Sequence, residues 1–81
     1  MMPPLTQFKR FDARDFIARG VEPLPEILRR ISSMKAGEGL IVLAPFLPSP
    51  LIEKLGSEGF TSKLERGNGS DWIVYFWREI G

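Results

Sequence analysis

The C-terminal segment of the chain restricts the fold more than any other segment, because nearly all of its side chains are large and apolar. Residues 71–78, DWIVYFWR, carry such side chains on both faces of a predicted strand. The two faces consist of Trp72, Val74 and Phe76 on one side and Ile73, Tyr75 and Trp77 on the other. Residues 60–66 are a second strand candidate, and the Gly-Asn-Gly-Ser segment at 67–70 predicts a hairpin turn between them. The fold must therefore contain an antiparallel hairpin with at least one broad face covered.

Two segments upstream have the three- and four-residue spacing of amphipathic helices. The apolar positions of the first are Leu24, Ile27, Leu28, Ile31 and Met34. Gly37 is expected to mark the end of this helix. The second helix is expected from Pro50 to about Glu58, because Ser49 is a favourable N-cap and proline suits the first helical position. Its inward side chains are predicted to be Leu51, Ile52 and Leu55.

Two further segments are expected to be strands. Residues 39–44, GLIVLA, form a continuous apolar run that is typical of an inner strand. Residues 8–13, FKRFDA, form a shorter candidate. From residue 14 to residue 21 the chain is polar and is broken by Gly20, so no element is expected there.

This order of elements predicts one fold class. A helix joins the first two strands, which should therefore be parallel, whereas the last two form an antiparallel hairpin. Two helices can cover only one face of a four-stranded sheet. We therefore predict an α/β (α+β) two-layer sandwich with the order β-α-β-α-β-β, a mixed four-stranded sheet, both helices on one face and the other face open. Residues 1–7 are predicted to be a flexible leader, and residues 8–81 a single domain.

The composition excludes several kinds of chemistry. The 81 residues include neither cysteine nor histidine, which removes disulfides, thiolate nucleophiles, Cys/His zinc sites and imidazole catalysis. The carboxylates do not cluster at a ligand-like spacing, so no metal and no cofactor is expected. A net charge of +1, with scattered cations such as Arg29 and Arg30, argues against nucleic-acid binding. No apolar run is long enough to span a membrane, and the cytoplasm is the expected location.

Three short motifs occur in an order that resembles a known superfamily. They are Phe11-Asp12-Ala13-Arg14, Glu22-Pro23-Leu24-Pro25 and Met34-Lys35-Ala36-Gly37-Glu38. On these motifs, across about residues 8–78, the chain resembles the TusA/SirA-like superfamily of small bacterial domains, whose first helix starts with Cys-Pro-x-Pro. The resemblance implies the same fold. It also implies that partner proteins meet the surface around the start of the first helix.

The position of the superfamily's sulfur-carrying cysteine is occupied here by Glu22. A carboxylate cannot form a persulfide, so sulfur-carrier activity is not expected. The chain is most similar to the cysteine-less branch of the superfamily, which often has a polar His/Asp-containing segment before a Pro-x-Pro-Leu helix start. This chain keeps the sequence PSPL at 48–51 but has APFL at 44–47 before it, so chemistry that depends on those polar groups is not carried over.

Glu22 has a structural and a functional interpretation. As the N-cap it would lie at the positive end of the helix dipole, with Pro23 and Pro25 in the first turn, where amides lack intrahelical partners. General acid–base catalysis needs a second titrating group and none is evident, so we expect a non-enzymatic protein-interaction or regulatory domain. The alternative is a small anionic ligand at the same helix start. The candidate residues of this partner or ligand surface are Arg14, Arg19, Glu22, Pro23, Pro25 and Phe46.

A second candidate surface is the open face of the sheet. Its candidate residues are Ile73, Tyr75 and Trp77, although the alternation alone does not decide which side of the strand faces outward. Three large side chains on an uncovered face form a patch that favours a protein interface, either a homodimer or a docked partner. The alternative is partial shielding of this face by the N-terminal leader.

Overall fold

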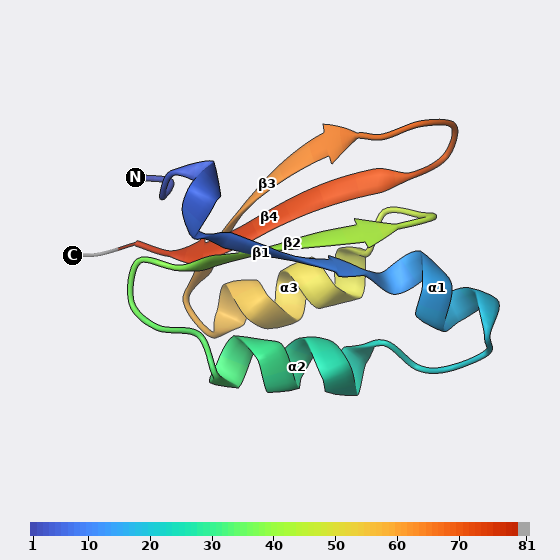
Figure 1. The fold of residues 1–81 in the computed structure, drawn as a ribbon, viewed down its shortest axis with the longest axis horizontal. Coiled ribbons are helices and arrows are strands. Elements are labelled where there is room, and N and C mark those ends of the chain that lie inside the picture. The colour runs from blue at the N-terminus through green and yellow to red at the C-terminus, as the bar shows by residue number, and fades with distance from the viewer. Residues whose placement is uncertain (80–81) are drawn as a thin grey trace.

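The computed structural model describes residues 1–79, and its helices and strands follow the predicted order with one addition (Figure 1). The elements are a 3-10 turn η1 (Leu5–Gln7), β1 (Phe8–Asp12), α1 (Ala13–Ala18), α2 (Leu24–Ser32), β2 (Gly39–Ala44), α3 (Ser49–Ser57), β3 (Phe60–Arg66) and β4 (Trp72–Arg78). The strands agree with the predicted segments to within one residue at each end. The last two residues of the predicted domain, 80 and 81, lie outside the described part of the chain.

The four strands form one mixed sheet in the order β1-β2-β4-β3. β1 and β2 are parallel, while β4 is antiparallel to both of its neighbours, β2 and β3. Helices α2 and α3 lie on the same side of the sheet, and η1 lies on the opposite side (Figure 1). The predicted α+β sandwich with one helix-covered face is therefore confirmed.

The core fills the space between the sheet and the helices. Its buried side chains are Phe11, Ala13, Ile27, Leu40, Val42, Leu51, Leu55, Phe60, Val74 and Phe76. The predicted inward stripe of α2 packs against this cluster, with Ile27 buried and its apolar neighbours half-buried. Val74 and Phe76 are fully buried, which assigns the alternate side chains of β4 to the other face of the sheet.

No helix is predicted between residues 14 and 21, but α1 occupies residues 13–18. Asp12 caps this helix by accepting a hydrogen bond from the backbone N–H of Arg14 at 3.0 Å. Phe16 packs its ring edge against Phe11, with ring centroids 5.0 Å apart. Gly20 then turns the chain with a φ of +72°. The polar composition hides this helix because a six-residue helix buries only one turn of side chains.

The predicted boundaries of α2 are wrong at both ends. The first helical hydrogen bond runs from the N–H of Ile27 to the carbonyl of Pro23, at 3.0 Å, so Pro23 is the N-cap and Glu22 precedes it. The helix ends at Ser32, before the predicted Gly37. The hydroxyls of Ser32 and Ser33 donate to carbonyls in the last turn, at 2.8 and 3.0 Å, and such local bonds compete with continuation of the helix.

Helix α3 shows a similar shift at its start. It begins at Ser49, with Pro48 in the cap position and Pro50 as the second helical residue, rather than with Ser49 as the cap. The predicted inward side chains Leu51 and Leu55 are buried. Both long helices therefore start with the same arrangement, a proline at the cap and a second proline two residues later.

Candidate binding groove and open sheet face

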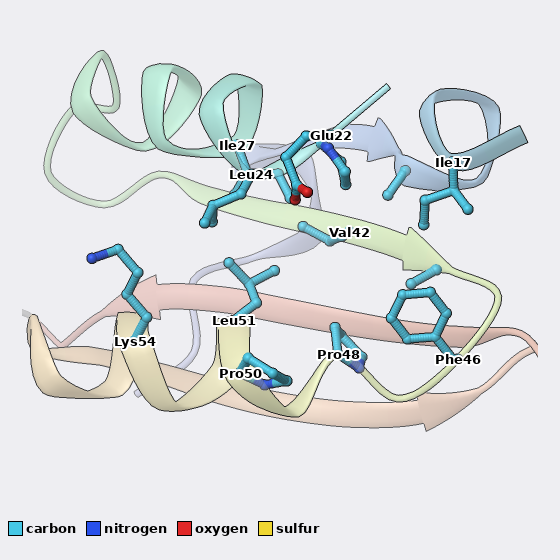
Figure 2. A pocket seen from close by; sticks show the side chains of 13 residues that line it. Ile17, Glu22, Leu24, Ile27, Val42, Phe46, Pro48, Pro50, Leu51 and Lys54 are labelled. Atoms are coloured by element: carbon cyan, nitrogen blue, oxygen red, sulfur yellow. The ribbon is translucent and has the colours of Figure 1, made fainter. Parts of the chain in front are cut away.

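A groove with a volume of about 300 Å³ lies where the N-terminal ends of α2 and α3 approach each other over β2 (Figure 2). Its walls come from α1, α2, α3 and the loop after β2, and its floor includes Val42 and Ala44 of β2. The lining is almost wholly apolar, and Glu22 and Lys54 are its charged residues. This volume is at the lower end of the range of ligand pockets.

The prolines explain why the start of two helices gives an apolar groove. A helix N-terminus normally presents free backbone N–H groups that favour anions. Pro23, Pro48 and Pro50 all line the groove, and proline has no N–H to present. The same residues that fix the helix starts therefore remove hydrogen-bond donors from the groove wall.

Glu22 supplies the polar group of the groove. Its carboxylate points into the space above Val42, between the first turn of α2 and helix α3 (Figure 2). No ion pair within residues 1–79 joins it to a cation. Lys54 pairs with Glu58, the C-cap residue of α3, at 3.5 Å. The groove thus offers apolar surface together with one acceptor of hydrogen bonds or positive charge.

The structure brings Glu22, Pro23 and Phe46 together in this groove but separates them from the other candidates of the same surface. Arg14, Arg19 and Pro25 are not part of its lining. Arg14 forms ion pairs with Asp12 and Asp71, at 2.8 and 2.7 Å. These carboxylates raise the pKa of Arg14 further above its ordinary value.

Arg19 is also engaged away from the groove. It pairs with Asp15 at 3.1 Å, and its guanidinium carbon lies 5.1 Å from the centroid of the Phe16 ring. The two arginines that motivated an anionic ligand are thus held by local carboxylates and an aromatic ring. They contribute no positive charge to the lining.

Apolar side chains continue from the groove onto the surrounding surface. Phe46 lines the groove with 52% of its surface exposed, and Val21 and Leu47, which neighbour lining residues in the chain, are 44% and 39% exposed. Sequence analysis selected Phe46 but missed Val21 and Leu47. The available signal was the segment APFLPSP at 44–50, which places large apolar residues in a proline-rich loop rather than in a helix or strand.

Val74 and Phe76 are buried on the helix-covered face, so the alternate side chains of β4 lie on the open face. These are Ile73, Tyr75 and Trp77. Trp77 is only 6% exposed. The Phe8 ring packs edge-on against it, with centroids 6.5 Å apart, and the Trp77 indole N–H donates to Glu79 at 3.2 Å. The open face is therefore shielded around Trp77, whereas Ile73 and Tyr75 are only half-buried.

Residues 1–7, the predicted leader, contribute to this end of the face. They include η1, and the Met1 amino group forms an ion pair with the Glu79 carboxylate. Tyr75 lies two residues before Trp77 on β4, and its phenolic hydroxyl donates a hydrogen bond to Glu65 at 2.9 Å. Burial, followed by this carboxylate, raises the pKa of Tyr75.

Within the described residues, no group of three acidic side chains could hold a metal ion. None of the helices in this part of the chain has the length and apolar character needed to cross a membrane.

The fold and the groove define a small two-layer α+β domain with an apolar groove at the helix starts. Over residues 10–78 the chain matches the family described as "Uncharacterized conserved protein (DUF2249)". The chain belongs to that family. No curated protein and no solved structure matches it.

Proposed function

We propose that this domain is a non-enzymatic protein-interaction module whose groove receives a large apolar side chain of a partner protein. The observation that carries the proposal is the apolar groove of about 300 Å³ with exposed Phe46 at its rim. Interfaces concentrate their binding energy in a few anchors that fill such pockets. A single large side chain matches a groove of this size.

The rim favours a protein over a free small molecule. Val21, Phe46 and Leu47 leave apolar surface exposed beyond the groove, where a small ligand would not cover it. A protein segment with an anchor in the groove would also cover these side chains. Glu22 adds a preference for an anchor that carries an N–H donor or a positive charge beside its apolar part.

The alternative of a small anionic ligand has weaker support. The lining includes the Glu22 carboxylate, while its cation Lys54 is paired with Glu58. The cations Arg14 and Arg19 are absent from the lining, and the prolines remove backbone donors. These features disfavour a bound anion.

Catalysis also lacks the groups it needs. Glu22 has no second titrating partner across the groove, because Lys54 is paired with Glu58. The resemblance to the TusA/SirA-like superfamily supports a partner surface at this helix start without sulfur transfer. By the same resemblance we expect a bacterial, cytoplasmic protein.

The test is site-specific photo-cross-linking in living cells. A benzoylphenylalanine at position 46 is expected to give a covalent adduct with a defined protein, while the same residue at position 64, which is exposed on the edge strand β3 and is not part of the groove lining, gives none. Sequencing of the adduct identifies the partner segment. The corresponding synthetic peptide should then shift the amide resonances of the non-proline residues in this region of the purified domain, which are Val21, Glu22, Leu24, Phe46, Leu47, Ser49 and Leu51.

Two results would contradict the proposal. One is the absence of a protein adduct at position 46 above the level at position 64. The other is a peptide whose resonance shifts fall on the open sheet face instead of the groove. Shifts at residues 21–24 with inorganic phosphate, without any peptide binding, would support the anionic-ligand alternative.

A further inference from the structure

We infer that the open face of the sheet is a homodimer interface, in which two copies of this chain stack face to face with their strands antiparallel. This surface is separate from the groove, so the inference stands or fails independently of the proposed function. It rests on the charge pattern of the face, which is complementary to itself.

The Phe8 ring of β1 covers one end of the face, where it packs edge-on against Trp77 and also contacts Tyr75 in the neighbouring row. The covered row contains Phe8, Gly39 and Trp77, which lie beside one another on β1, β2 and β4. The Phe8 ring lies over Gly39, where an added Cβ would be 2.3 Å from a ring carbon. The described part of the chain places no helix over the remaining two rows on this side (Figure 1).

The strand register defines these two rows. The first row, across β1, β2, β4 and β3, is Arg10, Ile41, Tyr75 and Lys63. The second row is Asp12, Leu43, Ile73 and Glu65. Each row has an apolar centre and a charge at both edges. The charges are both positive in the first row and both negative in the second.

A two-fold axis that runs across the strands between the rows places the first row of one copy on the second row of the other. Arg10 and Lys63 then face Asp12 and Glu65 of the second copy. Ile41 and Tyr75 face Leu43 and Ile73 in the same way. Such an interface is self-complementary, as a two-fold homodimer requires.

The other face-to-face arrangement is disfavoured by the same charges. An axis parallel to the strands would place Arg10 on Lys63 and Asp12 on Glu65, so that like charges meet at both edges. Opposed like charges suppress an otherwise apolar contact. The charge pattern therefore selects antiparallel stacking, with the sheets aligned as in a sandwich.

The edge charges are also engaged within one copy. The Asp12 carboxylate is paired with Arg14 at 2.8 Å, so the face is tested at the β3 edge, at Lys63 and Glu65. Lys63 lies 3.5 Å from Glu65, which in turn accepts the hydrogen bond from Tyr75. The Lys63 ammonium lies 5.8 Å from the centroid of the Tyr75 ring. The two rows hold eight residues per copy, fewer than the roughly 20–30 residues a side of a standard interface, so we expect a weak dimer with a dissociation constant above the nanomolar range.

The test uses paired charge reversals and sedimentation equilibrium. For the natural protein, the apparent mass should rise toward twice the monomer mass between about 10 μM and about 1 mM. Lys63→Glu and Glu65→Lys should each weaken self-association about tenfold or more, because each creates two like-charge contacts per dimer. An equimolar mixture of the two variants should associate again, since one then presents two negative residues on β3 and the other two positive ones.

Control variants separate this effect from changes in net charge or folding. Lys35→Glu makes the same charge change as Lys63→Glu, but on an exposed loop residue away from the face, and it should leave the dimer unaffected. Phe46→Ser in the groove should do the same. A monomer mass throughout the concentration range, or single variants that associate like the natural protein, would overturn the inference. Failure of the mixture to associate would overturn the antiparallel arrangement.

Discussion

At the scale of single residues, Gly39 is required by what lies above it rather than by its own backbone conformation. Its φ is not positive, but an added Cβ would lie 2.3–2.7 Å from three carbons of the Phe8 ring. The ring can occupy this position only because Gly39 has no side chain. From there it contacts Tyr75 and Trp77, with centroid distances of 5.8 and 6.5 Å.

Gly39→Ala should therefore lower the free energy of unfolding by about 1–3 kcal/mol, the usual cost of overpacking. In the background of Phe8→Ala the same change should cost much less, because the obstructing ring is gone. Urea unfolding of the natural protein, the two single variants and the double variant in a double-mutant cycle measures this coupling. Equal effects of Gly39→Ala in both backgrounds would show that the ring does not lie over Gly39.

At the scale of elements, α1 depends on Asp12 in two ways. The Asp12 carboxylate caps the helix at the backbone of Arg14, and it also accepts the Arg14 guanidinium at 2.8 Å. The hydrogen bond from Arg14 is the main reason that the pKa of Asp12 is lowered. A group with a lowered folded-state pKa contributes stability above its unfolded pKa of about 3.9, and this stability is lost as the pH falls through the folded value.

Asp12→Ala should destabilise the protein by about 1–2 kcal/mol at neutral pH through loss of the cap. Asp12→Asn keeps a capping oxygen but not the ionisable group, so it should be milder at pH 7. Below about pH 4 its stability should approach that of the natural protein. Thermal unfolding by circular dichroism between about pH 2 and pH 7 checks both expectations. A gap between Asp12→Asn and the natural protein that is constant with pH would contradict the role of the ionised carboxylate.

At the scale of the whole molecule, one core carries the stability of a short chain. A domain of this length buries a smaller share of its surface than a larger one and has a narrow stability margin. Leu55 has no exposed surface and packs between α3 and the sheet, whereas Leu64 is 44% exposed on the edge strand β3. The same substitution at these two positions therefore separates core packing from surface effects.

Leu55→Ala should cost about 2–5 kcal/mol, a large part of the total stability, because it leaves a cavity in the core. Leu64→Ala should cost less than about 1 kcal/mol, since most of the lost contact is with water. Chemical denaturation measures the unfolding free energy of each variant, and the two values can be compared directly when the denaturant slopes of the variants are equal. Comparable losses at the two positions would mean that the core is not centred on α3 and β4.

The periodicities of the sequence determined the fold class, because burial of apolar side chains depends on spacing along the chain. Apolar side chains recur at helical spacing from Leu24 to Met34 and fill consecutive positions of the strands at 39–44 and 72–77, which is the pattern of one helix packed on an inner part of a sheet. Helix boundaries were less predictable, since Pro23 and Ser32 act through local hydrogen bonds that spacing does not express. The short helix α1 was missed because its six residues bury only one turn of side chains.

Tertiary structure alone decided which candidate residues share a site. Arg14 and Glu22 are close in sequence, but Arg14 turns to Asp71, 57 residues away along the chain, while Glu22 faces the groove. The groove itself joins the starts of two helices that are 25 residues apart along the chain, at Leu24 and Ser49. The charge rows of the open face exist only through the strand register. Such contacts depend on how the layers pack, which a linear pattern of apolar and polar residues does not specify.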